Sequence, residues 1–246
     1  RALTPLFRRP MCANGFAHAC APWVGSYHKL DGGYSLWGLQ ALTGDEVSNW
    51  RLEKGGAWGE YEIRYKNSLS EISFYKRLID GKHSTTSGSA EFFDMLEQWD
   101  SEECVLAAST SGVDTTQKGD TTSTHGLVAG HAYALTTVKK VGSHRMLRLR
   151  NPWGQFEWDG DWSDSSSLWE KHPDVCRACE GGGKAVDDGF FWMEFTDFCA
   201  HFRSVDVCHR SRGIRCAYHV FNRSAVVRVV QTSLRLLCCC SAASAS

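Results

Sequence analysis

Residues 126–164 read GLVAGHAYALTTVKKVGSHRMLRLRNPWGQFEWDGDWSD, and this stretch decides the fold of the chain. Its first part, Gly126–Thr137, is rich in β-branched, aromatic and small apolar residues, and Arg145–Arg150 mixes basic with apolar residues. Val141-Gly142-Ser143 lies between the two parts and is typical of a turn. The stretch therefore predicts a β-hairpin.

This hairpin would place two polar side chains at its open end. If the turn is centred near Val141, antiparallel pairing puts His131 opposite Asn151. The same register forms two apolar pairs, Tyr133 with Leu149 and Leu135 with Leu147. Because side chains alternate between the two faces of a strand, all six paired residues lie on one face. An imidazole is therefore expected beside a carboxamide.

A histidine beside an asparagine has a known chemical use. A histidine that shuttles a proton needs one ring nitrogen held by a hydrogen-bond partner, so that the other nitrogen is free and the ring is in the correct tautomer. An Asn oxygen can accept from the ring without adding a charge, as in the Cys–His–Asn version of the catalytic triad. Trp153 could shield the contact of His131 with Asn151 from water. The alternative is a structural hairpin whose His and Asn satisfy each other at the sheet edge.

Four segments of the chain resemble a known family. GLVAGHAYAL and RLRNPWGQFEWDGDWSD, both within residues 126–164, resemble the second half of the calpain protease core, a branch of the papain-like cysteine proteases. DDGFFWMEFTDFCAHF, residues 187–202, resembles the family's segment Asp-Gly-x-Phe-Trp-Met-x-Phe-x-Asp-Phe. The resemblance extends more thinly to GSYHKLDGGYSLWGLQALTGD, residues 25–45.

The resemblance implies an α+β, papain-like cysteine protease fold, here its mostly antiparallel-sheet lobe with a few short helices. Residues 25–210 are expected to form this His/Asn lobe, between an irregular segment at 1–24 and a tail of uncertain structure at 211–246. The implied activity is calcium-dependent hydrolysis of peptide bonds in protein or peptide substrates, in the cytoplasm.

The resemblance also implies a role for each residue of the hairpin site. His131 is expected to act as the general base, and Asn151 to orient its ring. Trp153 would shield their contact, and the backbone of Gly130 would line the substrate cleft. These four residues form the predicted active site.

The nucleophilic cysteine of the family is not recognisable in this chain. The family carries it in a Gly-Asp-Cys-Trp segment that opens a helix in a separate lobe, where the helix N-terminus lowers the thiol pKa. None of the eleven cysteines has that context, Cys12 and Cys20 included. A His–Asn pair alone cannot carry out covalent acyl transfer. The chain is therefore expected to work with the missing nucleophile lobe or other domains of a longer chain, unless it is an inactive polypeptide-binding or regulatory module, or a truncated gene product.

Calcium is the second expectation that follows from the resemblance. By position, Glu157, Asp164 and Asp188 correspond to carboxylate ligands in two acidic loops, and Val186 lies where the family uses a backbone carbonyl. Phe190 stands where the family has a further Glu. Calcium prefers about six to eight oxygen ligands, so the loss of one carboxylate should weaken the site. The alternative is that these acids are solvated loop charges.

Composition argues against some classes of function. The 246 residues carry a net charge of −1, and 22% of them are charged, so no strong attraction to nucleic acid or to a membrane surface is expected. No apolar run reaches the roughly 18 residues of a transmembrane helix. Eleven scattered cysteines without a secretion signal favour a reducing, cytosolic compartment. Cys176 and Cys179, with His172 nearby, form only half of a zinc motif, because a second pair of ligands is missing.

Local patterns predict further elements outside the hairpin. Residues 91–100 have apolar side chains at helical spacing, which predicts an amphipathic helix with Phe92, Met95, Leu96 and Trp99 on its buried face. Residues 69–79 also indicate a helix, 25–43 indicate turns and short packed pieces, and 109–124 indicate a loop. Thr196 is expected to cap the short helix that follows it. Short strands are expected at 61–65, 104–108, 190–195 and 205–208.

Overall fold

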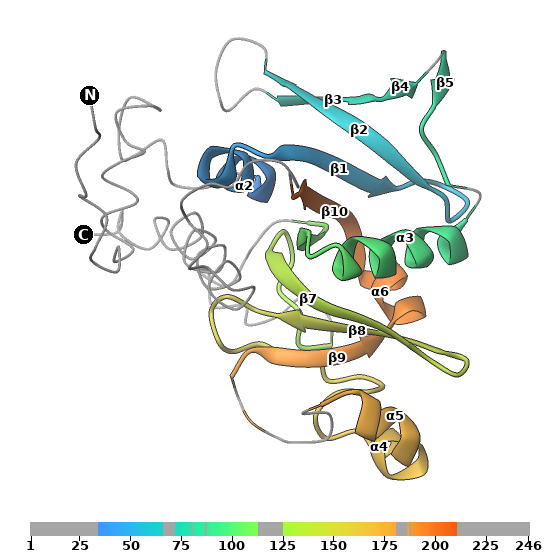
Figure 1. Cartoon of the computed structure of the whole chain (residues 1–246). Helices are drawn as coiled ribbons and strands as arrows, with labels where there is room; N and C mark the ends of the chain where they lie inside the picture. The colour runs from blue at the N-terminus through green and yellow to red at the C-terminus, as the bar shows by residue number, and fades with distance from the viewer. Residues whose placement is uncertain are drawn as a thin grey trace, which may run out of the picture.

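The computed structural model of the chain describes residues 34–65, 72–79, 81–86, 88–112, 125–180, 186 and 188–210. The segments expected at 1–24 and 211–246 lie outside the described residues. An eight-stranded sheet dominates the described part, and every pair of neighbouring strands in it is antiparallel (Figure 1). Its strands, in spatial order, are β3 (Ile72–Lys76), β2 (Trp58–Tyr65), β1 (Glu46–Leu52), β10 (Phe202–His209), β6 (Val105–Thr110), β7 (Ala132–Val141), β8 (His144–Arg150) and β9 (Phe190–Glu194).

Short helices and a second small hairpin complete the described fold. The helices are α2 (Ser35–Thr43), α3 (Ser89–Ser101), α4 (Leu168–Lys171), α5 (Pro173–Ala178) and α6 (Phe195–His201), and the small hairpin pairs β4 (Leu78–Ile79) with β5 (Lys82–His83). The expected α+β class, with a mostly antiparallel sheet and a few short helices, is confirmed. None of the described helices is long and apolar enough to cross a membrane.

Helix α3 lies against the sheet (Figure 1), and its apolar side chains are part of the main core. Phe92, Leu96 and Trp99 are buried, as the helical spacing predicts, and Met95 is partly buried beside them. Trp58 of β2 stacks on Phe92 with the ring centroids 4.2 Å apart. Aromatic rings bury large areas and dominate the energetics of a core. The main core therefore lies between α3 and the inner face of the sheet.

The central hairpin forms, but its register differs from the predicted one. Its strands are joined by Gly142-Ser143, so the turn is not centred on Val141. With this offset and regular pairing, the apolar residues expected on one face would lie on opposite faces in the two strands, because side chains alternate between the faces residue by residue. A bulge between Leu135 and Thr137 restores the alternation and sets Leu135 opposite Leu149. The four apolar residues expected on one face accordingly share the main core: Tyr133, Leu135, Leu147 and Leu149.

Three local predictions are wrong. Residues 72–76 form the edge strand β3 rather than a helix, because pairing with β2 supplies their backbone hydrogen bonds. Residues 35–43 form helix α2 rather than turns, and Gly44 ends it in the left-handed conformation with φ of 70°. Thr196 does not cap α6. Instead, the Glu194 carboxylate accepts from the Thr196 N–H at 2.7 Å, because an acidic side chain suits the positive end of a helix.

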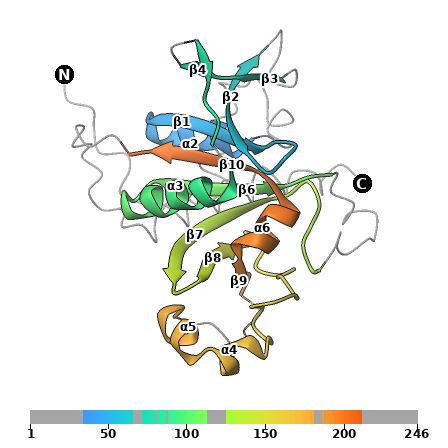
Figure 2. The same ribbon diagram turned by 90° about the vertical axis from the view of Figure 1, so that its right-hand side faces the viewer.

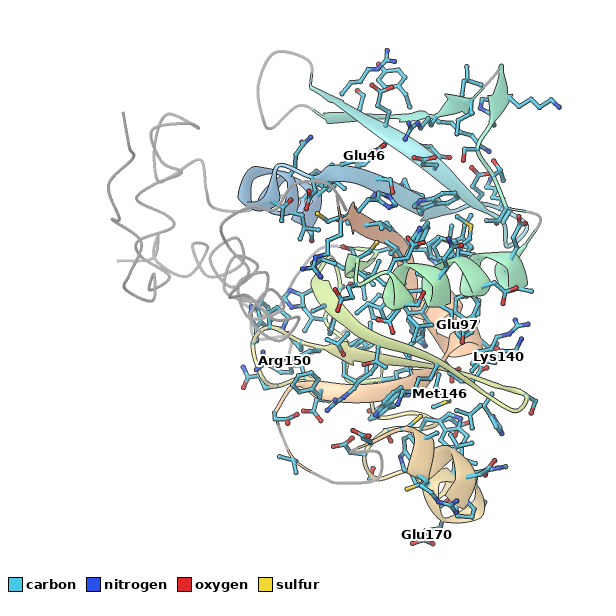
Figure 3. The ribbon with its side chains drawn as sticks, in the orientation of Figure 1. Glu46, Glu97, Lys140, Met146, Arg150 and Glu170 are labelled. Atoms are coloured by element: carbon cyan, nitrogen blue, oxygen red, sulfur yellow. The ribbon has the colours of Figure 1, made fainter. Side chains whose placement is uncertain are left out.

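A smaller core lies between the sheet and helices α4 and α5, which sit beneath β8 and β9 in both views (Figure 1, Figure 2). Met146, labelled in Figure 3, belongs to this core together with Trp169 and Trp192. Cys179 is buried in this cluster, and Cys176 packs against it. Within the described ranges, no group of three His, Cys, Asp or Glu side chains is arranged to hold a metal ion. The Cys-x-x-Cys pair contributes to packing here.

Candidate active site

His131 and Asn151 meet at the open end of the hairpin. His131 directly precedes β7, and Asn151 directly follows Arg150, the last residue of β8, which Figure 3 labels. The imidazole Nε2 lies 3.0 Å from the Asn151 Oδ1, a hydrogen-bond distance. Both residues are buried, with 2% and 0% of their surface exposed. Little water can compete for this contact, so it holds the ring in one position.

Aromatic rings enclose the imidazole. The ring of Trp153 lies over His131, with centroids 4.2 Å apart and planes inclined by 42°. Tyr133 contacts the imidazole edge to face, with centroids 5.1 Å apart. Gly130, directly before His131, has a left-handed φ of 62° and so turns the chain into β7. The residues expected around the site are therefore gathered at one sheet end.

The Asn151 carboxamide has one orientation that agrees with its contacts. Its Nδ2 donates to the Phe156 carbonyl at 3.2 Å, and its Oδ1 accepts from the Trp153 N–H at 3.0 Å. The atom that faces His131 is therefore an oxygen, which can only accept. Consequently the imidazole Nε2 is the donor, and in neutral His131 the lone pair is on Nδ1.

The loop that carries Asn151 is tied to the start of β9. The Asn151 N–H donates to the Gly189 carbonyl at 2.8 Å, and the Gly189 N–H donates to the Glu157 Oε1 at 2.6 Å. Gly189 has a φ of +83°, and a Cβ there would lie 2.6 Å from the Asn151 carbonyl oxygen, so only glycine fits. Phe156 also has a left-handed φ, of 61°, at the residue whose carbonyl receives the Asn151 amide.

The residues expected to bind calcium lie near the start of β9, beside the loop that carries Asn151. Glu157 Oε1 also accepts from the Asp188 N–H at 3.0 Å, and Asp164 Oδ2 accepts from the Val186 N–H at 3.3 Å. Burial, with the nearby charge of Asp188, raises the pKa of the Asp164 carboxyl above its ordinary value. Glu157 and Asp164 thus bind the backbone N–H groups of Val186, Asp188 and Gly189. These carboxylates are not assembled, within the described part, as a group of three metal-ligating side chains.

Comparison with known proteins identifies the family of this chain. The model of the family described as "Calpain family cysteine protease" matches residues 13–209. The chain belongs to the calpain family. The matched range includes His131, Asn151 and both acidic loops of this calpain-family chain, and it confirms the resemblance seen in the sequence.

Curated calpains share about a third of their aligned residues with this calpain-family chain. Calpain-9 of Mus musculus is 31% identical over 195 residues, and calpain-9 of Homo sapiens is 36% identical over 197 residues. Each alignment covers 78% of the chain and 23% of the relative. The calpain-type cysteine protease DEK1 of Arabidopsis thaliana is 33% identical over 185 residues, which are 74% of the chain and 7% of that relative. The chain therefore spans less than a quarter of the length of these relatives.

Three described cysteines of this calpain-family chain are free thiols: Cys179, Cys199 and Cys208. Burial raises the pKa of the Cys179 and Cys208 thiols to about 11, and it also raises that of Cys199. A nucleophilic cysteine needs the opposite shift, toward the thiolate. These three thiols are therefore unsuited to attack a peptide bond, and Cys12 and Cys20 lie outside the described residues.

The sequence did not indicate three residues that hold His131 and Asn151 in place. Thr110 contacts the His131 backbone from the end of β6, within a segment that was expected to be a loop. Gly189 lies in the Asp-Gly motif, and a glycine that directly precedes a strand is a usable signal for a position that excludes side chains. The left-handed backbone of Phe156 leaves no such signal, because Phe does not favour positive φ.

Proposed function

We propose that this chain is the His/Asn lobe of a calpain-type cysteine endopeptidase, and that it supplies the general base to a thiol carried by another part of the protease. The observation that carries the proposal is the buried contact of 3.0 Å between His131 Nε2 and Asn151 Oδ1. Its substrates would be proteins or peptides. The free thiols of Cys179, Cys199 and Cys208 suit a reducing compartment, and we propose the cytoplasm.

In the proposed reaction, Nδ1 of His131 takes the proton of the cysteine thiol, and the thiolate attacks the carbonyl carbon of the scissile peptide bond. The tetrahedral intermediate collapses, the C–N bond breaks, and the imidazolium gives its proton to the leaving amine. Water then attacks the thioester and gives a proton to His131, the C–S bond breaks, and the imidazolium returns that proton to the departing cysteine. Asn151 keeps the Nε2 proton in place through both stages, while Trp153 excludes water from that contact.

The test of this function is complementation. The nucleophile lobe of a calpain, with its Gly-Asp-Cys-Trp segment, is joined to this chain in one polypeptide, and cleavage of a fluorogenic peptide is measured. We expect cleavage by the joined protein and not by either part alone. If the joined protein folds and binds the peptide without cleaving it, the chain is instead an inactive polypeptide-binding module.

The chain alone should not hydrolyse peptides, with or without calcium. Thiols with a raised pKa remain protonated at neutral pH, and the thiol form is a poor nucleophile. None of the eleven cysteines has the family's Gly-Asp-Cys-Trp context, so no single cysteine should react preferentially with a thiol-protease inhibitor, which mass spectrometry of the adducts would show. Peptide cleavage that one Cys→Ala change abolishes would place the nucleophile within this chain and contradict the proposal.

We also propose that calcium binds weakly between the two acidic loops. Glu157, Asp164 and Asp188 would supply carboxylate oxygens and Val186 a backbone carbonyl, which are ligands that calcium prefers. The proposal is supported by the convergence of the Glu157 and Asp164 side chains on Val186, Asp188 and Gly189. A bound cation would add a neutralising charge between carboxylates that otherwise repel each other.

Two features should keep this affinity low. Glu157 and Asp164 already accept backbone N–H groups, so a cation would compete with those hydrogen bonds. Phe190, where the family has a further acid, instead lies under two guanidinium groups. Arg148 and Arg150 lie 4.4 Å and 5.0 Å from its ring centroid, and their positive charges oppose a nearby cation.

Calcium should therefore raise the thermal midpoint only at concentrations of about 10⁻⁴ M or more, the range of weak sites. Phe190→Glu adds a carboxylate and should shift this dependence to lower calcium, whereas Asp188→Ala should abolish it. Asp174→Ala, at an exposed acid of α5, is the matched control and should leave the dependence unchanged. If calorimetric titration gives no heat and the midpoint does not move, even in Phe190→Glu, then these acids are loop charges.

A further inference from the structure

Thr110, the last residue of β6, holds the peptide groups on both sides of the His131 side chain. Its hydroxyl oxygen accepts from the His131 N–H at 3.0 Å, and its own backbone N–H donates to the His131 carbonyl at 3.0 Å. The hydroxyl also donates to the Val128 carbonyl at 2.7 Å. One side chain from a neighbouring strand therefore bonds both ends of the turn that leads into His131.

This turn has few other means of holding its shape. His131 precedes β7, so its backbone N–H is not part of the regular ladder that fixes the strand. The turn contains Gly130 at a φ of 62°, and its further bonds are Gly130 N–H to the Ser111 carbonyl at 3.1 Å and Val128 N–H to the Tyr133 hydroxyl at 2.8 Å. Buried backbone groups need partners, and here the Thr110 hydroxyl supplies two of them.

We propose that Thr110 is a positioning residue for His131: its hydroxyl closes the turn of residues 128–131 and so keeps the imidazole against Asn151. The inference rests on the proposed function of the His131–Asn151 pair. A general base must be held close to the productive geometry, because a misplacement of about 1 Å can lower a rate by about 10²-fold. A movement of the His131 backbone would carry the ring away from Asn151 Oδ1 and weaken the hydrogen bond that holds the Nε2 proton.

The competing interpretation is that Thr110 only stabilises the end of β6. Two substitutions separate hydroxyl from shape: Thr110→Ser keeps the hydroxyl, and Thr110→Val keeps the branched shape without it. Thr43→Val is the matched control. The Thr43 hydroxyl also donates to a backbone carbonyl, of Leu39 at 2.8 Å, and accepts from an N–H, of Asp45 at 3.1 Å, but it lies at the end of α2 and contacts Cys208.

The first measurement is the His131 tautomer, read from imidazole ¹⁵N NMR of the histidine-labelled chain at about pH 8, where an ordinary imidazole is neutral. The signal is assigned with His131→Gln. The unmodified chain, Thr110→Ser and Thr43→Val should each show one tautomer, protonated at Nε2. Thr110→Val should show a mixture. The inference is overturned if Thr110→Val keeps the single tautomer, or if Thr110→Ser loses it.

The second measurement is amide hydrogen exchange. Data from the unmodified chain alone can contradict the inference. In the unmodified chain, the His131 amide should be protected relative to the Ala129 amide. Thr110→Val should speed exchange of the His131 amide about fivefold to tenfold, the effect of one lost hydrogen bond. Equal exchange at His131 and Ala129 in the unmodified chain would overturn the inference, even if Thr110→Val did not fold.

Both readouts are independent of activity. If the tautomer and exchange change as expected while the complemented protease is inactive, the proposed function fails and the positioning of His131 by Thr110 stands. If the complemented protease is active and Thr110→Val matches the unmodified chain in tautomer and in kcat, only the role of Thr110 fails.

Discussion

Replacing His131 by glutamine should lower kcat of the complemented protease by about 10³-fold or more. General acid–base catalysis contributes about 10²–10⁴-fold, and both acylation and hydrolysis of the thioester use the same imidazole. Glutamine keeps a polar side chain that can contact Asn151, but it cannot take the proton of a thiol. KM should change little, because proton transfer stabilises the transition state and not the bound substrate. The measurement is kcat and KM for a fluorogenic peptide.

His144→Gln is the control with the same chemical change. His144 begins β8 and packs beside the smaller core, with its ring centroid 5.1 Å from that of Trp162 and 4.9 Å from that of His172. This variant should leave kcat close to that of the unmodified protein. Asn151→Ala should fall between the two, at about 10²-fold, because it releases the ring without removing the base. A full kcat in His131→Gln would exclude His131 as the base.

The face that carries the candidate site could be predicted from the sequence, whereas the register could not. Alternation with a period of two follows from strand geometry alone. His131 and Asn151 therefore share a face in every register in which the numbers of two paired residues add up to an even number. The two-residue turn at Gly142-Ser143 and the bulge near Thr137 depend on packing against the core. Together the turn and the bulge shift the pairing by an even number of residues, so His131 and Asn151 still lie on one face and contact each other.

Other features have no local signal because they come from distant parts of the chain. Strand β10 lies between β1 and β6 in the sheet, and this order joins residues far apart in sequence. Asn49 and Asp206 are 157 positions apart, yet the Asn49 Nδ2 donates to the Asp206 Oδ1 at 2.6 Å. Nothing near either residue indicates burial. Edge strand β3 was missed for the same reason, since its partner β2 and not its own composition determines it.

The buried Asp206 makes the stability of the fold dependent on pH. Burial raises the pKa of its carboxyl from 3.8 to about 6, although the Asn49 amide and the Leu36 N–H both favour the charged form. The folded state therefore holds this proton to higher pH than the unfolded state does. Stability from the bound proton is complete below about pH 4, is lost as the pH rises toward 6, and stays lost above it. A shift of about two pH units corresponds to roughly 3 kcal/mol.

Asp206→Asn should consequently raise the free energy of unfolding by up to roughly 3 kcal/mol above pH 6, with little gain below about pH 4. The new amide keeps an accepting oxygen and adds a donor for the Asn49 Oδ1, which has no hydrogen-bond partner among the described residues. Asp94→Asn removes the same charge from an exposed position on α3 and should show no such gain. Urea unfolding from about pH 4 to pH 8 measures both variants. A gain that is equal at every pH, or a loss above pH 6, would contradict the assignment of a destabilising buried carboxylate to Asp206.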